Sequence, residues 1–129
     1  MPEYTDYIHS LDEDAASLVM GYRLRAQEQV GIVTEGTSYG MPALRYRGRP
    51  LISIVATKAG FAVYPFSSDV VASALPELDG FASTKGGIKF TAEKQLPVAV
   101  FDKMLRERKA EIDAALGADS GGGGGGRGR

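Results

Sequence analysis

The residues best suited to binding chemistry lie around a break in the middle of the chain. Segment 37–46 carries an aromatic, a thioether and a guanidinium side chain around a Gly-Met-Pro break at 40–42. Farther along, a glycine pair stands between lysines, and consecutive backbone N–H groups beside cations can receive a phosphate or a carboxylate. The sequence therefore predicts a pocket for a small anion or metabolite that includes Tyr39, Met41, Arg45, Tyr64, Phe66, Lys85, Gly86, Gly87 and Lys89.

Each of these residues also has an ordinary structural interpretation. A glycine pair is common in a tight turn or a β-bulge, aromatic side chains are common in a core, and lysines are usually solvated. The aromatic residues can equally form an interface with a second copy of the chain or with another protein. At the level of the sequence these alternatives stay open.

Known catalytic motifs are absent from the sequence. It contains no Gly-x-x-x-x-Gly-Lys-Ser/Thr loop, no Gly-x-Gly-x-x-Gly turn and no His-Glu-x-x-His helix. It has no cysteine and one histidine, His9, so thiolate nucleophiles and cysteine-based metal sites are excluded. A Ser-His-Asp arrangement would depend on that single histidine. We therefore expect a non-catalytic binding protein.

Length and composition indicate one ordinary globular domain. The chain has 129 residues, of which 43% are hydrophobic and 24% are charged, and this length is typical of a single domain. The net charge of −1 indicates neither a nucleic-acid nor a membrane partner, and an Arg-Gly end with two arginines adds little attraction for RNA. The acidic N-terminal residues contain no apolar run, so we expect no signal peptide and a cytoplasmic location.

Amphipathic spacing predicts a long helix over residues 11–29. Ser10, followed three residues later by Glu13, fits a capping box at its start, and Gly31 fits its end. A short helical turn around residues 4–8 is expected before it.

Short extended segments separated by turn residues follow this helix and predict a sheet. Their connections are too brief to hold a crossover helix, so the strands must pair antiparallel. The Gly-Met-Pro break predicts a bent or bulged strand. Segment 51–57 is apolar on both faces and is placed centrally. The expected strands are 34–39, 43–47, 51–57, 61–64 and an interrupted strand over 81–90.

Two further helices complete the predicted domain. Ser67 and its neighbours can cap a short helix that Pro76 stops, and Pro97 suits the first turn of a helix that Gly117 ends. The predicted class is α+β, with N-terminal and C-terminal helices packed on an antiparallel sheet of about five strands. Residues 1–116 form this domain, and the glycine-rich residues 117–129 are expected to be a disordered tail.

Four blocks of the chain stand in a fixed order. They are Ser-Tyr-Gly-Met-Pro-Ala at 38–43, Arg-Pro-Leu at 49–51, Tyr-Pro-Phe at 64–66 and Thr-Lys-Gly-Gly-Ile-Lys-Phe at 84–90. In this order and spacing they resemble the YdhG-like family, a bacterial domain of unknown function that includes a frataxin-like intracellular iron chaperone. The resemblance covers about residues 3–113 and implies helices packed on an antiparallel sheet in α-β-α order.

The resemblance also implies a function in delivering iron to protein partners. In frataxin-like proteins an acidic helical ridge holds iron weakly and exchangeably through carboxylate oxygens, which are hard donors. Acids at a helix N-terminus have a plainer explanation, because each favours the helix dipole by about 0.3–1 kcal/mol while staying solvated. The counterparts of the ridge in this chain are Glu3, Asp6, Asp12, Glu13 and Asp14, with His9 beside them, and the expected iron ligands are Asp12, Glu13 and Asp14.

Overall fold

The computed structural model describes residues 3–117 and contains a five-stranded antiparallel sheet in the order β1-β2-β3-β4-β5. Every strand pairs with its neighbour in the sequence, which confirms the predicted antiparallel α+β class and places β3 at the centre. The strands are β1 (Thr34–Ser38), β2 (Met41–Tyr46), β3 (Arg49–Thr57), β4 (Gly60–Tyr64) and β5 (Ile88–Phe90).

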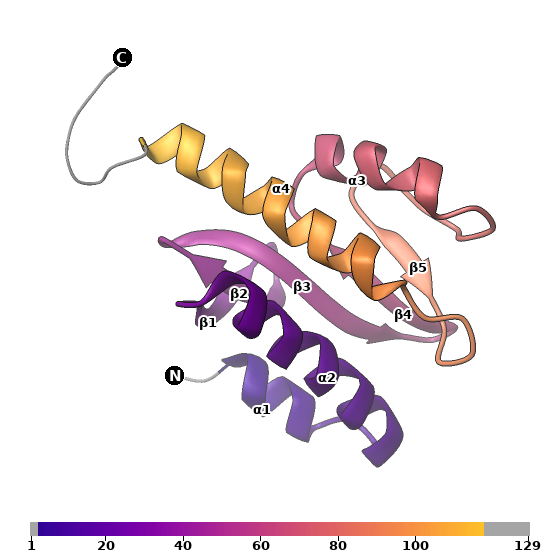
Figure 1. The fold of residues 1–129 in the computed structure, drawn as a ribbon. Coiled ribbons are helices and arrows are strands. Elements are labelled where there is room, and N and C mark those ends of the chain that lie inside the picture. Colours follow the sequence, from indigo (N-terminus) through magenta and orange to yellow (C-terminus); the bar gives the residue numbers. More distant parts are fainter. Residues whose placement is uncertain (1–2, 118–129) are drawn as a thin grey trace.

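Four helices accompany this sheet and share one hydrophobic core with it. In Figure 1, α1 and α2 lie to one side of the long strand β3 in the view, and α4 and α3 lie to the other. α2 packs against α4, and α4 packs against α3. The helices are α1 (Glu3–His9), α2 (Glu13–Val30), α3 (Ser68–Ala74), followed by the short 3-10 helix η1 (Leu75–Glu77), and α4 (Val98–Leu116).

Strand pairing divides the sheet residues between two faces, because paired residues of neighbouring strands point to the same side. The helix face supplies the core and carries Leu44, Ile52, Ile54, Phe61, Val63, Ile88 and Phe90, all buried among helix side chains. The second face is built mainly from smaller or polar residues. It carries Gly36, Ser38, Met41, Ala43, Arg45, Ser53, Val55, Ala62, Tyr64 and Lys89.

The start of α2 differs from the predicted capping box. Asp12 is the N-cap, and its carboxylate accepts a hydrogen bond from the Ala15 N–H at 2.9 Å. The Ser10 hydroxyl instead donates to the Tyr7 carbonyl at the end of α1. The prediction was wrong because α1 ends directly before Ser10, so that the serine hydroxyl binds the Tyr7 carbonyl in the last turn of α1. The predicted end is confirmed, since Gly31 is the C-cap.

Two tyrosine hydroxyls of α1 complete the hydrogen bonding of β3. The ladder between β2 and β3 ends at the Leu44–Ile52 pair, although β3 continues to Thr57. The Tyr4 hydroxyl donates to the Ile54 carbonyl and accepts from the Ile54 N–H, both at 2.5 Å. The Tyr7 hydroxyl accepts from the Ala56 N–H at 2.7 Å. On this edge of β3, the side chains of Tyr4 and Tyr7 therefore supply the hydrogen-bond partners that a neighbouring strand would otherwise provide.

The β1–β2 hairpin leaves this ladder and turns across the second face of the sheet. A straight ladder would carry its tip towards the Ala56 end of β3. Instead, Tyr39 at the tip stacks on Phe66, which lies beyond the opposite end, and the Ser53 hydroxyl donates to the Pro42 carbonyl at 2.6 Å. Pro42 has no N–H to offer β3, which favours the departure.

Two details of the predicted strands are wrong. The Gly-Met-Pro break is a hairpin turn at Tyr39 and Gly40, which leave Ser38 and Met41 paired, and the register shift lies instead between Leu44 and Arg45. Segment 81–90 is not one interrupted strand. It folds back on itself, and the Lys89 N–H donates to the Ala82 carbonyl.

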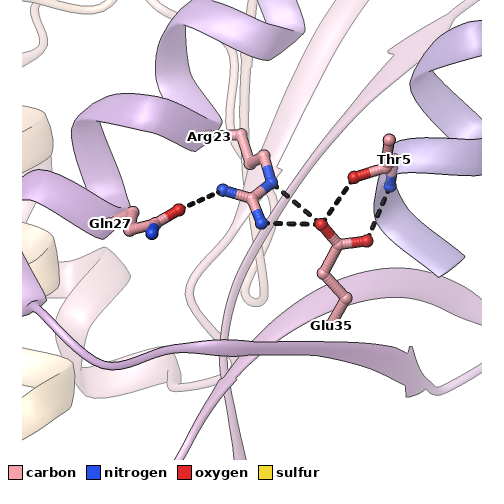
Figure 2. A network of polar contacts seen from close by, with 4 residues as sticks. All are labelled: Thr5, Arg23, Gln27 and Glu35. Atoms are coloured by element: carbon pink, nitrogen blue, oxygen red, sulfur yellow. Dashed lines mark hydrogen bonds and ion pairs between the residues drawn. The ribbon is translucent and has the colours of Figure 1, made fainter. Parts of the chain in front are cut away.

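A partly buried carboxylate, Glu35, ties β1 to α1 and α2 (Figure 2). It accepts hydrogen bonds from the Thr5 backbone N–H and hydroxyl, both at 2.7 Å. Arg23 donates from Nε and Nη2 to the same carboxylate, and Nη1 binds Gln27. Burial raises the pKa of Glu35, but the bonds from Thr5 and Arg23 outweigh it and bring that pKa below its ordinary value.

Within residues 3–117 no helix is long and apolar enough to cross a membrane. The predicted disordered tail, apart from Gly117, lies outside the described residues.

The Tyr4→Phe variant tests the role of the tyrosine hydroxyl. It leaves two buried backbone groups of Ile54 without partners, so we expect the free energy of unfolding to fall by about 3 kcal/mol. Tyr7→Phe is the matched control and should lose about 1 kcal/mol, because it frees a single, partly buried N–H. Urea unfolding measures both. An equal loss in the two variants would contradict the proposed ladder.

Glu35→Gln tests the partly buried ion pair. Because the pKa of Glu35 is lowered in the folded state, its contribution is present above the ordinary carboxyl value of 4.5 and is lost as pH falls through the folded value. At neutral pH the variant should be less stable by about 3 kcal/mol, with Arg23 left unpaired. The difference from wild type should shrink as pH is lowered below the ordinary carboxyl value. The exposed Glu93→Gln is the control, and unfolding curves at several pH values measure the effect.

Candidate functional site

A pocket of about 290 Å³ lies where the tip of the β1–β2 hairpin meets the end of β4. We call it the aromatic pocket. It brings together five of the predicted binding residues from three separate parts of the chain, and two serines from the start of α3 join them. Its lining residues are Tyr39, Met41, Tyr64, Phe66, Ser67, Ser68 and Gly86.

Two aromatic rings stack at the rim of the aromatic pocket. The ring centroids of Tyr39 and Phe66 are 5.8 Å apart, with an interplanar angle of 21°. Both residues have left-handed backbone conformations, with φ of 53° at Tyr39 and 58° at Phe66. At Tyr39 this belongs to the two-residue hairpin turn with Gly40, and Arg47 has the same φ in the next hairpin turn. Phe66 adopts it outside a hairpin turn, where it costs energy. Tyr39 remains 85% exposed. The stacked pair therefore lies at the surface, with Phe66 partly buried and Tyr39 exposed.

The glycine pair Gly86-Gly87 packs next to Tyr64, a lining residue of the aromatic pocket. A Cβ on Gly87 would lie 2.6 Å from two carbons of the Tyr64 ring, so only glycine lets that ring pack against the 84–87 turn. The Gly87 N–H donates to the Thr84 hydroxyl, and the Gly87 carbonyl accepts from the Thr84 N–H. The Gly87 N–H is thus committed to a tight turn, the structural alternative weighed for this pair. Gly86 is exposed and lines the pocket.

The predicted cationic residues lie outside the lining of the aromatic pocket. Arg45 extends along the β1–β2 hairpin, where its Nη2 donates to the Thr37 carbonyl at 3.3 Å. Lys85 is exposed next to Gly86. Lys89 lines a separate cavity of about 260 Å³ that also includes Lys94.

Ser67 and Ser68 are the pocket residues that sequence reasoning did not assign to it. Ser67 was predicted as a helix cap, and its side chain does accept from the Val70 N–H at 3.2 Å. It also donates to a carboxylate oxygen of Glu111 at 2.8 Å. Their position directly after Phe66, a predicted pocket residue, is the feature of the sequence that could have assigned these serines to the pocket.

A larger hollow of about 620 Å³ lies between α2 and the segment leading into α4. Three of its polar side chains, those of Tyr22, Arg25 and Gln95, have partners within the chain. The Tyr22 hydroxyl donates to the Leu96 carbonyl, and Arg25 forms an ion pair with Asp102 at 2.6 Å. We consider the aromatic pocket, with the exposed Tyr39 ring stacked on Phe66, the better candidate for a binding site.

The acidic residues predicted to bind iron stand exposed at the start of α2. One carboxylate oxygen of Asp12 is engaged as the helix cap. Asp12 and Asp14 line a further cavity, in which Lys58 is also present. Among residues 3–117, no three histidine or acidic side chains are grouped so that they could hold a metal ion. Iron binding by Asp12, Glu13 and Asp14 stays a prediction.

Comparison with known proteins bears on the fold. No family model matches the sequence, and no curated protein matches it significantly. The structure is similar to the crystal structure of YdhG, a DUF1801 family protein from Bacillus subtilis, with a TM-score of 0.71. The two are 14% identical, and the match covers 92% of this chain and 94% of that chain. The likeness confirms that this chain has a YdhG-like fold.

Proposed function

We propose that this protein is a non-catalytic binding module whose ligand places a planar or apolar group in the aromatic pocket. The observation that carries this proposal is the stacked pair of Tyr39 and Phe66. The left-handed backbone of Phe66 costs folding energy, and the 85% exposed ring of Tyr39 returns little buried area; strain and exposure of this kind are typical of functional sites. A ligand that covers the rings would recover this area.

The chemistry of the lining supports binding rather than catalysis. The ionisable groups in the lining are the hydroxyls of Tyr39 and Tyr64, and the lining contains no carboxylate, imidazole or amine. Ser67 already donates to Glu111, so its hydroxyl proton is engaged. General acid–base catalysis needs a group with a pKa near neutrality within reach of the substrate. The lining is better suited to stacking and to a few directional hydrogen bonds.

Delivery of iron is a second proposal, supported by the exposed carboxylates of Glu13 and Asp14 at the surface of α2. Carboxylate oxygens on a solvated surface bind a hard cation exchangeably, as delivery requires. This site and the aromatic pocket share no residues, so the two proposals are tested separately.

The aromatic pocket is tested with adenosine and indole as planar probes. Methionine methyl NMR provides an internal comparison, because Met41 lines the pocket while Met104 is buried in the core. We expect the Met41 signal to shift on titration and the Met104 signal to stay. Phe66→Leu should weaken binding by roughly ten-fold, since it removes one stacking ring worth about 1 kcal/mol or more. A Met41 signal that no planar probe moves would contradict the proposal.

The iron site is tested by anaerobic calorimetric titration with Fe²⁺. The variant Asp12→Asn/Glu13→Gln/Asp14→Asn removes the charges, and asparagine still caps α2 about as well as aspartate. We expect measurable heat in the wild type and its loss in this variant. The control is Asp69→Asn/Asp79→Asn/Glu93→Gln, which removes three exposed carboxylates elsewhere. No heat in the wild type, or equal losses in both variants, counts against the site.

A further inference from the structure

The charge of the sheet is distributed unevenly between its two faces. The five strands contain one carboxylate, Glu35, which lies on the helix face and is bound by Thr5 and Arg23. The seven ion pairs among residues 3–117 each use at least one helix residue. The second face carries Arg45 and Lys89 and no carboxylate. On this face the strands therefore present positive charge and no negative charge to an anion, although the whole chain has a net charge of −1.

Arg45 is held on the second face close to the aromatic pocket. Its side chain runs back along the hairpin over Gly36, where an added Cβ would lie 3.0 Å from the arginine Cδ and 3.2 Å from Nε. Its Nη2 reaches the Thr37 carbonyl. Thr37 is two residues from Tyr39, and because the chain turns at Tyr39 their backbones lie at most about 7 Å apart, the rise of two residues in an extended strand. That distance is comparable with the reach of a ribose 5′-phosphate.

The guanidinium of Arg45 has capacity for a further acceptor. Within residues 3–117 it forms no ion pair, and its hydrogen bond there is the exposed one from Nη2 to Thr37. The Nη groups are therefore the donors left for a ligand, whereas the Nε without a partner is buried. A guanidinium presents five donors in a planar arrangement that suits phosphate and carboxylate oxygens. The residues flanking the pocket lining in the sequence add one cation, Lys85, and one carboxylate, Asp69. They balance each other, and Glu111, which accepts from Ser67, is paired with Arg108. Arg45 therefore decides the net charge around the site.

We propose that the ligand of the aromatic pocket is a nucleoside phosphate. Its base lies against the rings of Tyr39 and Phe66, and its phosphate is bound by Arg45 on the second face. This inference rests on the proposed binding function and adds the chemical class of the ligand. At about 290 Å³ the pocket is at the lower limit of small-molecule sites. It therefore accommodates one planar group, while the charged part of the ligand extends over the hairpin.

The test compares AMP, adenosine and inorganic phosphate, with the Met41 methyl signal as the reporter. We expect AMP to bind roughly ten-fold more tightly than adenosine, which corresponds to one favourable charged contact. Phosphate alone should bind more weakly than either. The preference for AMP should decrease as ionic strength rises, because exposed charges are screened.

Arg45→Met is the decisive variant, since methionine keeps an apolar stem over Gly36 and removes the charge. It should abolish the preference for AMP and leave adenosine binding unchanged. The control is Arg106→Met, which removes an exposed arginine of α4 and should change neither affinity. Arg45→Gln is the second variant, with the same expectation, should the methionine variant fail to fold by circular dichroism.

The outcomes separate this inference from the proposed function. Adenosine and AMP binding with equal affinity at Met41 would overturn the phosphate assignment and leave the aromatic pocket in place. Unchanged AMP affinity in a folded Arg45 variant would overturn it as well. If neither compound moves Met41, the proposed function itself fails. A short oligoadenylate distinguishes the sources of the ligand, because tighter binding than AMP indicates single-stranded RNA and equal or weaker binding indicates the free nucleotide.

Discussion

The hydroxyl of Tyr4 is the contact on which the shape of the sheet depends. A strand in the middle of a sheet needs partners on both edges, because buried backbone groups without hydrogen bonds cost about 1–3 kcal/mol each. Where β2 stops pairing with β3, Tyr4 supplies both an acceptor and a donor to Ile54. Burial also raises the pKa of this hydroxyl, so it stays protonated and able to donate at neutral pH. A side chain of a helix thus replaces a strand.

Because Tyr4 takes the place of a partner strand beside β3, the β1–β2 hairpin is free to cross the second face of the sheet. α1 fills the edge of β3, Pro42 has no N–H to give it, and Glu35 anchors the hairpin to α1 and α2. The tip of the hairpin is then carried to the end of β4, where Tyr39 meets Phe66. The aromatic pocket lies where the two segments meet, and the interaction that opens the ladder therefore also creates the candidate site.

Local patterns in the sequence predicted most of the helices and strands but few of the contacts between them. Helical periodicity, Gly31 and Pro97 located α2 and α4, and the two apolar faces of segment 51–57 placed β3 centrally, because these signals depend on near neighbours. The partner of Ile54 lies 50 residues away, and no local pattern reports it. For the same reason Asp102 pairs with Arg25, 77 residues distant in the chain. Five predicted pocket residues do meet, whereas Arg45, Lys85, Gly87 and Lys89 lie outside the lining, because residue type alone does not fix the path of a hairpin.

The contact between Arg45 and Thr37 has a consequence for solubility. β1 is an outer strand of the sheet, and an outer strand presents backbone groups that can template the addition of a strand from another molecule. The guanidinium caps the Thr37 carbonyl on this strand and sets a positive charge beside it. A second molecule would have to displace that charge before it could pair there, so the arginine also protects the protein against edge-to-edge aggregation.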